Sequence, residues 1–250
     1  MATSTPEALA QRIAELRAKD LQFADAQPDD VVTTTLQRPD VRLAEVITTV
    51  LTGYADRPAL GQRAVELVKD PVSGATRQRP LPRFDTITYG ELGRRVDALL
   101  ASLVTDPQIG LRPGDRVCLL GFTSVDYTTI DIALMRLGAV GVPLHTGASS
   151  AQLAPIVAET EPTVIAASIE AIDDVVELAI TAHAPKHVMV FDYDHRDDYQ
   201  RHMLERAEAR LSSQAGLTIE PLTAAIARGA ALPRPEITGT GSTSRRSTCA

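Results

Sequence analysis

The sequence has no tryptophan and few other aromatic residues, which make up only 4% of its 250 positions. Base-stacking platforms of the kind that bind single-stranded nucleic acid are therefore not expected. Basic residues are also too few and too scattered to form a cationic face, since the net charge is −7 and basic clusters are limited to short pairs such as Arg245 and Arg246 near the end. The composition argues against nucleic acid as a partner.

Cysteines and long apolar runs are scarce as well. The two cysteines, Cys118 and Cys249, suggest neither a disulfide framework nor a zinc site, and Cys118 stands in an apolar run that predicts burial. No apolar run approaches the ~18–20 residues that cross a bilayer, so no membrane span is expected. The first six residues lack the basic region and apolar stretch of a secretory signal, which makes a cytoplasmic location the default expectation.

What the sequence does contain is an ordinary globular composition, with 44% hydrophobic and 23% charged residues, and a regular alternation of strands and helices after residue 90. The predicted strands are 117–121, 139–144, 163–167, 187–191 and 218–221. The predicted helices are 91–104, one between Ser124 and Gly138, 149–159, 170–182, 197–213 and one ending near Gly229. This order predicts an α/β fold, with a mostly parallel, Rossmann-like sheet flanked by helices on both faces.

The first 90 residues follow a different plan. Leu9, Ile13 and Leu16 predict a helix over 6–19, which Thr5 can cap. Residues 25–42 are rich in Asp, Pro and Thr and predict an extended connector, followed by a helix over 43–54. A hairpin is expected within 59–89, because turn-forming residues at 70–74 separate two strand-like runs.

No complete catalytic motif is present. The sequence lacks a G-x-x-x-x-G-K-[ST] phosphate loop, a G-x-S-x-G elbow and an H-E-x-x-H pair. Gly138 and Gly141 fit a helix end and a strand entry better than a dinucleotide fingerprint. The Gly/Ser/Thr stretch 239–244 can present amides to a phosphate, but arginines rather than a lysine follow it. We therefore interpret residues 238–250 as a disordered tail.

The histidines offer two further candidate sites. They are His145, His183, His187, His195 and His202. His183 and His187 have the helical spacing of a metal pair, but Pro185 ends the helix between them. The acidic loop around His195 can hold a hard cation, although a solvated loop is the more common outcome. His145 follows a predicted strand, where α/β sheets bind ligands, and a structural role is its main alternative. We assign no catalytic, cofactor-binding or metal-binding residue.

Several stretches resemble the adenylate-forming (AMP-binding) superfamily. They are Ile87-Thr88-Tyr89-Gly90-Glu91-Leu92, Gly114-Asp115-Arg116-Val117 and Leu137-Gly138-Ala139-Val140-Gly141-Val142-Pro143-Leu144. A narrower resemblance, to carboxylic acid reductases (also labelled fatty-acid–CoA ligases), runs from about residue 8 to residue 237. It is strongest in Leu60-Gly61-Gln62-Arg63, Leu81-Pro82-Arg83-Phe84-Asp85-Thr86, Gly121-Phe122-Thr123-Ser124-Val125-Asp126-Tyr127 and Ile156-Val157-Ala158-Glu159-Thr160-Glu161-Pro162-Thr163.

The resemblance implies a domain that activates a fatty or aromatic carboxylic acid with ATP and Mg. In the full-length family, a phosphopantetheine carrier then takes the acyl group, and a reductase domain uses NADPH to release the aldehyde. On this basis we divide the chain into a helical arm and connector (1–42), a partial adenylation domain (43–237) and the tail (238–250), which reflects either a shifted reading frame or an internal gap.

The family's phosphate loop ends in a lysine that this chain lacks, and its adenine, ribose and acyl-pocket motifs would all follow residue 250. We therefore expect no cofactor to bind this fragment and no activity from the fragment alone. Two alternatives stay open. One is a half-domain that acts as a non-catalytic docking module, and the other is a small enzyme of another α/β class.

Overall fold

The computed structural model describes residues 5–234, which form two compact units divided between Val41 and Arg42. The interpretation of 238–250 as a disordered tail falls outside the described residues. The domain boundaries expected at residues 42 and 237 also remain predictions. Each unit is described by itself below.

The first unit is helical. It consists of α1 (Pro6–Lys19), α2 (Leu21–Ala26) and α3 (Asp30–Leu36). The helix expected over 6–19 is present, with Thr5 at its N-cap position but without the expected side-chain hydrogen bond. The extended connector predicted over 25–42 is wrong, because α2 and α3 reach into it. Asp20 caps α2 by accepting from the Phe23 amide, and Asp29 caps α3 by accepting from the Val31 amide at 2.8 Å.

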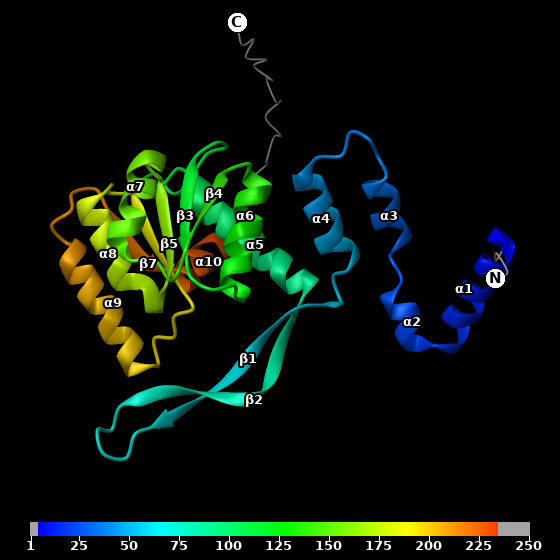
Figure 1. Cartoon of the computed structure of the whole chain (residues 1–250), viewed down its shortest axis with the longest axis horizontal. Coiled ribbons are helices and arrows are strands. Elements are labelled where there is room, and N and C mark those ends of the chain that lie inside the picture. The colour runs from blue at the N-terminus through cyan, green and yellow to red at the C-terminus, as the bar shows by residue number, and fades with distance from the viewer. Residues whose placement is uncertain (1–4, 235–250) are drawn as a thin grey trace, which may run out of the picture. The chain divides into compact units, whose positions relative to one another are not determined.

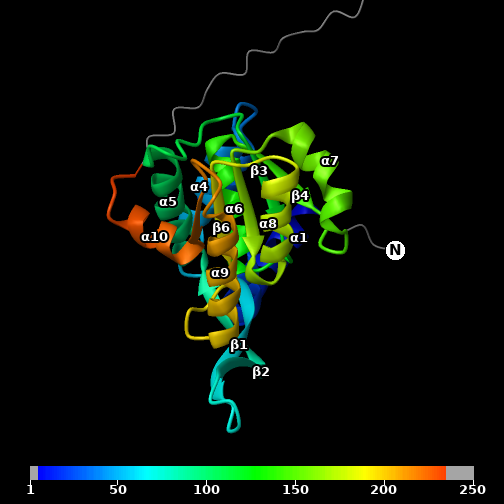
Figure 2. The same cartoon turned by 90° about the vertical axis from the view of Figure 1, so that its left-hand side faces the viewer.

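The second unit contains the predicted parallel sheet. Its five strands, in the spatial order β4-β3-β5-β6-β7, are all parallel. They are β3 (Arg116–Leu120), β4 (Val140–Leu144), β5 (Val164–Ser168), β6 (His187–Phe191) and β7 (Thr218–Pro221). The helices are α4 (Leu43–Gly53), α5 (Tyr89–Thr105), α6 (Val125–Leu137), α7 (Ser150–Thr160), α8 (Ile172–Thr181), α9 (Asp198–Leu211) and α10 (Leu222–Ala230). Helices cover both faces of the sheet, as Figures 1 and 2 show, and the predicted fold class is confirmed.

Alternate residues of the central strands enter two separate cores. In β3, Val117 and Leu119 pack with α4, α5, α6 and α10, whereas Cys118 and Leu120 pack with α7, α8 and α9. Cys118 is a free, fully buried thiol, and its burial raises its pKa. Burial on both faces explains why these strands are continuously apolar in sequence. Among residues 5–234, no helix is long and apolar enough to cross a membrane.

Local signals place the helix ends where the sequence predicts them. Ser124 caps α6, since its hydroxyl accepts from the Tyr127 amide at 3.0 Å. Gly138 ends the same helix in the left-handed region, with φ of 78°, which suits a residue without a side chain. At the start of α7, the Ser149 amide donates to the Gln152 side-chain oxygen at 3.0 Å, which is one half of a capping box.

The expected hairpin is present, and its strands are longer than the predicted runs. It consists of β1 (Pro58–Lys69) and β2 (Thr76–Thr88), paired antiparallel. The turn between them is closed by Asp70, whose carboxylate accepts from the amides of Val72 and Ser73. Figure 1 shows the hairpin extending away from the parallel sheet of the same unit. Most of its side chains are therefore half-buried or exposed.

Helices α10 and α5 cross at close range at Gly229. A Cβ atom added to Gly229 would lie 1.7 Å from the Ala98 carbonyl oxygen, whereas one added to Gly93 in α5 would meet only the Leu51 side chain at 3.6 Å. In an open helix, Gly→Ala stabilises by about 1 kcal/mol. At Gly229 we expect overpacking to reverse the sign, so that Gly229→Ala lowers the free energy of unfolding by roughly 1–3 kcal/mol.

Urea unfolding of the two variants tests this prediction. Gly93→Ala is the matched control, and it should be neutral or stabilising. If Gly229→Ala proved as stable as Gly93→Ala, the close crossing of α10 over α5 would be disproved.

Candidate functional site

The carboxyl ends of the parallel strands form the first candidate site. The chain passes from β3 to β4 on one side of the sheet and then returns to β5 on the other side of β3. The strand order therefore reverses beside β3, and open α/β sheets bind ligands at such a position, outside the carboxyl ends of their strands.

Three acidic or hydroxylic side chains meet at this edge. Asp126, in the first turn of α6, accepts from the Asp192 amide at 3.0 Å and forms an ion pair with Arg95 of α5. Ser124, which caps α6, also lowers the pKa of the Asp192 carboxyl. These contacts tie the ends of β3 and β6 to α5. The sequence identified Ser124 as a cap but gave no sign of the Asp126–Asp192 contact.

Asp192 is the most perturbed carboxyl at this edge. Burial raises its pKa to about 6, and the charges of Asp126 and Glu170 raise it too, while the Ser124 hydrogen bond opposes them. One carboxylate oxygen, Oδ1, is buried and lacks a hydrogen-bond partner among the described residues. The backbone of Asp192 lies in the left-handed region, with φ of 53°. The ionised carboxylate is therefore unfavourable here at neutral pH.

We expect Asp192→Asn to stabilise the protein at pH 7.5. A carboxyl whose pKa is raised on folding favours the folded state below its ordinary pKa of 3.8, and that benefit is lost as the pH rises through about 6. The difference in pKa sets an upper bound of about 3 kcal/mol, which the partial solvent exposure of the side chain reduces. Asparagine also tolerates the left-handed backbone.

Denaturant unfolding from pH 4 to pH 8 measures the effect. The advantage of Asp192→Asn should grow from pH 4 to about pH 6 and then level off, whereas Asp174→Asn, an exposed carboxyl on α8, should show no such trend. A constant difference between wild type and Asp192→Asn across the range would show that ionisation of Asp192 is not the cause.

His145 lies at the carboxyl end of β4, as predicted. Since β4 is an edge strand, this residue stands at one side of the carboxyl edge rather than at its centre. Its side chain is exposed, and its Nδ1 atom accepts from the Gly147 amide at 3.1 Å. That bond closes a local turn, which fits the structural alternative. A role in ligand binding remains untested.

The acidic loop after β6 holds the hairpin. The Asp197 carboxylate caps α9 and also accepts from the Gln78 amide at 2.8 Å, while Asp198 accepts from the Thr76 amide at 2.6 Å. Arg77, between those two hairpin residues, stacks its guanidinium over the Tyr199 ring. The expectation of a merely solvated acidic loop is therefore wrong, because these carboxylates supply acceptors to the outer edge of β2.

The structure separates the other predicted residues. Asp194 pairs with Arg196, which holds the pKa of Asp194 down at about 2, and no cluster within residues 5–234 could hold a metal ion. His187 lies inside β6, where its Nδ1 hydrogen-bonds to Thr218 Oγ1 at 2.7 Å and burial lowers its pKa. Since β6 carries His187 and His183 lies beyond the end of α8, the two do not share a helix face.

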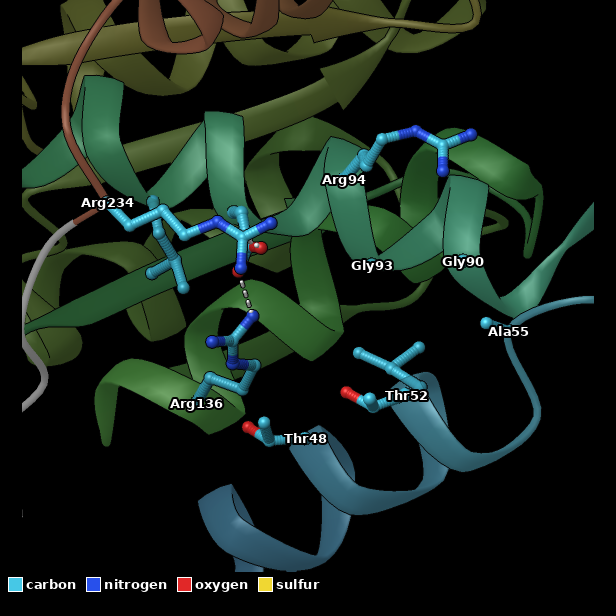
Figure 3. Close-up of a pocket in the computed structure, with 11 residues that line it drawn as sticks. Thr48, Thr52, Ala55, Gly90, Gly93, Arg94, Arg136 and Arg234 are labelled. Carbon is cyan, nitrogen blue, oxygen red and sulfur yellow. Dashed lines mark hydrogen bonds and ion pairs between the residues drawn. The ribbon is translucent and has the colours of Figure 1, made fainter.

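The sequence did not predict a pocket on the face of the sheet that α4, α5, α6 and α10 cover. It has a volume of about 410 Å³ and lies between α4, α5 and α6, with the segment after α10 at its edge (Figure 3). Its polar lining consists of Thr48, Thr52, Arg94, Asp97, Arg136 and Arg234. Four separate segments supply these side chains, so no local sequence motif reveals the pocket.

These features can be compared with known proteins. Residues 52–232 match the family model described as AMP-binding enzyme, and the chain belongs to that family. Within it, the chain resembles carboxylic acid reductases. It is 52% identical over 229 residues to the enzyme from Mycobacterium tuberculosis and 41% identical over 229 residues to that from Segniliparus rugosus. The alignments cover 92% and 91% of this chain but 19% of each relative, so the chain spans about a fifth of their length.

Solved structures agree with this assignment. The adenylation and carrier didomain of the Segniliparus rugosus carboxylic acid reductase, in complex with AMP, matches 91% of this chain with a TM-score of 0.83. The adenylation domain from Mycobacterium chelonae matches 94% with a TM-score of 0.80. This chain covers 32% and 36% of those two chains. The resemblance expected from the sequence motifs is confirmed, and so is an α/β fold that matches part of a carboxylic acid reductase adenylation domain.

Proposed function

We propose that this chain forms the N-terminal part of an ATP-dependent, carboxylate-activating domain and does not catalyse activation by itself. The observation that carries the proposal is the match of residues 52–232 to AMP-binding enzymes, together with a parallel sheet that superposes on a carboxylic acid reductase adenylation domain. That related domain holds AMP and a co-purified carboxylic acid. On this basis the substrates of the complete domain are a carboxylic acid and ATP, with Mg.

The basic residues of the chain support the negative half of the proposal. Formation of an acyl-adenylate requires preorganised positive groups around the reacting phosphates. The lysines of the chain are Lys19, Lys69 and Lys186. Lys19 belongs to α1, Lys69 ends β1, and Lys186 directly precedes β6 at the amino edge of the sheet. Within the unit that holds the sheet, neither Lys69 nor Lys186 stands at the carboxyl edge, and the cluster there is acidic.

Acid-dependent exchange of pyrophosphate into ATP tests both parts of the proposal: that the segment belongs to a carboxylate-activating domain, and that it is inactive alone. The chain alone should show only background exchange. A chimera, in which residues 5–234 replace the matching segment of the Segniliparus rugosus adenylation domain, should exchange, because the acceptor domain then supplies the phosphate-binding groups. The unmodified Segniliparus rugosus domain is the positive control.

Two results would contradict the proposal. Exchange by the chain alone, dependent on added acid, would show that activation needs no further residues. A chimera that unfolds cooperatively, like the parent domain, but shows no exchange would show that this segment does not serve carboxylate activation. That result would favour the alternative of a docking module.

A further inference from the structure

We propose that the pocket between α4, α5 and α6 is a binding site for a phosphomonoester, separate from the carboxyl edge of the sheet and independent of the proposed function. The pocket lies on the face of the sheet covered by α4, α5, α6 and α10, next to the core that contains Val117 and Leu119. Its lining comes from helix sides and from the segment after α10, rather than from strand ends. Nothing in the adenylation proposal uses it.

The charge of the lining selects the ligand. Asp97 is the single carboxylate, and it pairs with both Arg136 and Arg234, the latter at 3.2 Å. Arg94 is the third guanidinium, and it forms no ion pair with any other residue between 5 and 234. Three guanidinium groups and one carboxylate leave two positive charges unbalanced. A phosphomonoester carries a charge of about −1.5 to −2 at neutral pH, which matches this excess. A carboxylate carries a single negative charge and would leave one positive charge uncompensated.

The hydrogen-bond donors point to the same ligand. A guanidinium group offers five N–H donors, and two of these groups share the acceptors of the single Asp97 carboxylate. The side chain of Arg136 is only 15% exposed, so water reaches few of its donors. Thr48 donates its hydroxyl to the Ala44 carbonyl and can therefore only accept at the pocket. The surplus of planar donors favours bidentate contact with phosphate oxygens.

The shape of the pocket leaves room for an organic group. A volume of about 410 Å³ falls within the usual range for small-molecule sites, about 300–1,000 Å³. Leu51, Leu100 and Ala55 provide apolar walls, and Gly90 and Gly93 line the α5 side without side chains. Figure 3 shows Thr48 and Thr52 on α4 facing the Arg136 side of the pocket, while Arg94 extends away from Arg136. Arg94 is exposed, so rotation about its side-chain bonds can bring it to a bound anion.

Calorimetric titration of the full chain with phenyl phosphate at pH 7.5 tests the proposal. We expect saturable binding, and phenyl sulfate should bind about tenfold more weakly, since it has the same shape but a single charge. Arg94→Gln should weaken phenyl phosphate binding about tenfold, the effect of losing one charge-assisted hydrogen bond. Arg206→Gln, an exposed arginine of α9 that pairs with Asp173, is the matched control and should change the affinity less than twofold.

A second variant separates the pocket from surface charge. Thr52→Trp fills the pocket from the exposed side of α4 without altering any charge, and it should abolish binding. The proposal is overturned if wild type gives no saturable heat with phenyl phosphate, if Arg206→Gln weakens binding as much as Arg94→Gln, or if Thr52→Trp binds like wild type. Equal affinity for phenyl phosphate and phenyl sulfate would likewise refute a site for a dianion.

Discussion

Burial of the central strands on both faces is the constraint on which the rest of this structure depends. β3, β5 and β6 send alternate side chains into two cores, so each core needs its own layer of helices. A sheet covered on one side only would leave Cys118, Ile165 and Val188, or their neighbours on the opposite face, in water. At about 25 cal/mol per Å² of apolar surface, such exposure would exceed the net stability of a domain. The helices must therefore be divided between the two faces, with α4, α5, α6 and α10 on one face and α7, α8 and α9 on the other.

The same constraint explains why the second half of the chain was predictable. A strand buried on both faces is a continuous apolar run, and a surface helix has a single apolar stripe, so the two differ in sequence. Caps at Ser124 and Ser149 and the left-handed Gly138 then set the ends of the helices. The prediction for residues 25–42 was wrong because these residues are not part of the sheet core and so lack a clear apolar pattern. Asp29 lies in a stretch rich in Asp, Pro and Thr, a composition that suggested a loop, but in the structure it caps the short helix α3.

Contacts between distant segments were not predictable in this way. The acidic loop at 194–198 was interpreted as solvated because its residues are polar and close in sequence. Its role depends on the outer edge of β2, whose amides need acceptors once the hairpin has formed. The phosphate pocket is a similar case, since Thr48, Arg94, Arg136 and Arg234 come together only after α4, α5, α6 and the segment after α10 have packed. The spacing of residues in a single sequence does not reveal such long-range tertiary contacts.

Helix α5 links the two candidate sites. Arg95 pairs with Asp126 in the first turn of α6, and Asp97 pairs with Arg136 in the last turn of α6. Each α6 partner has the charge that suits its end of the helix dipole, negative at the N-terminus and positive at the C-terminus. Asp126 also holds the end of β6 through the Asp192 amide, whereas Arg136 lines the pocket. A shift of α6 against α5 would therefore disturb the carboxyl edge and the pocket together, although the two sites share no lining residue.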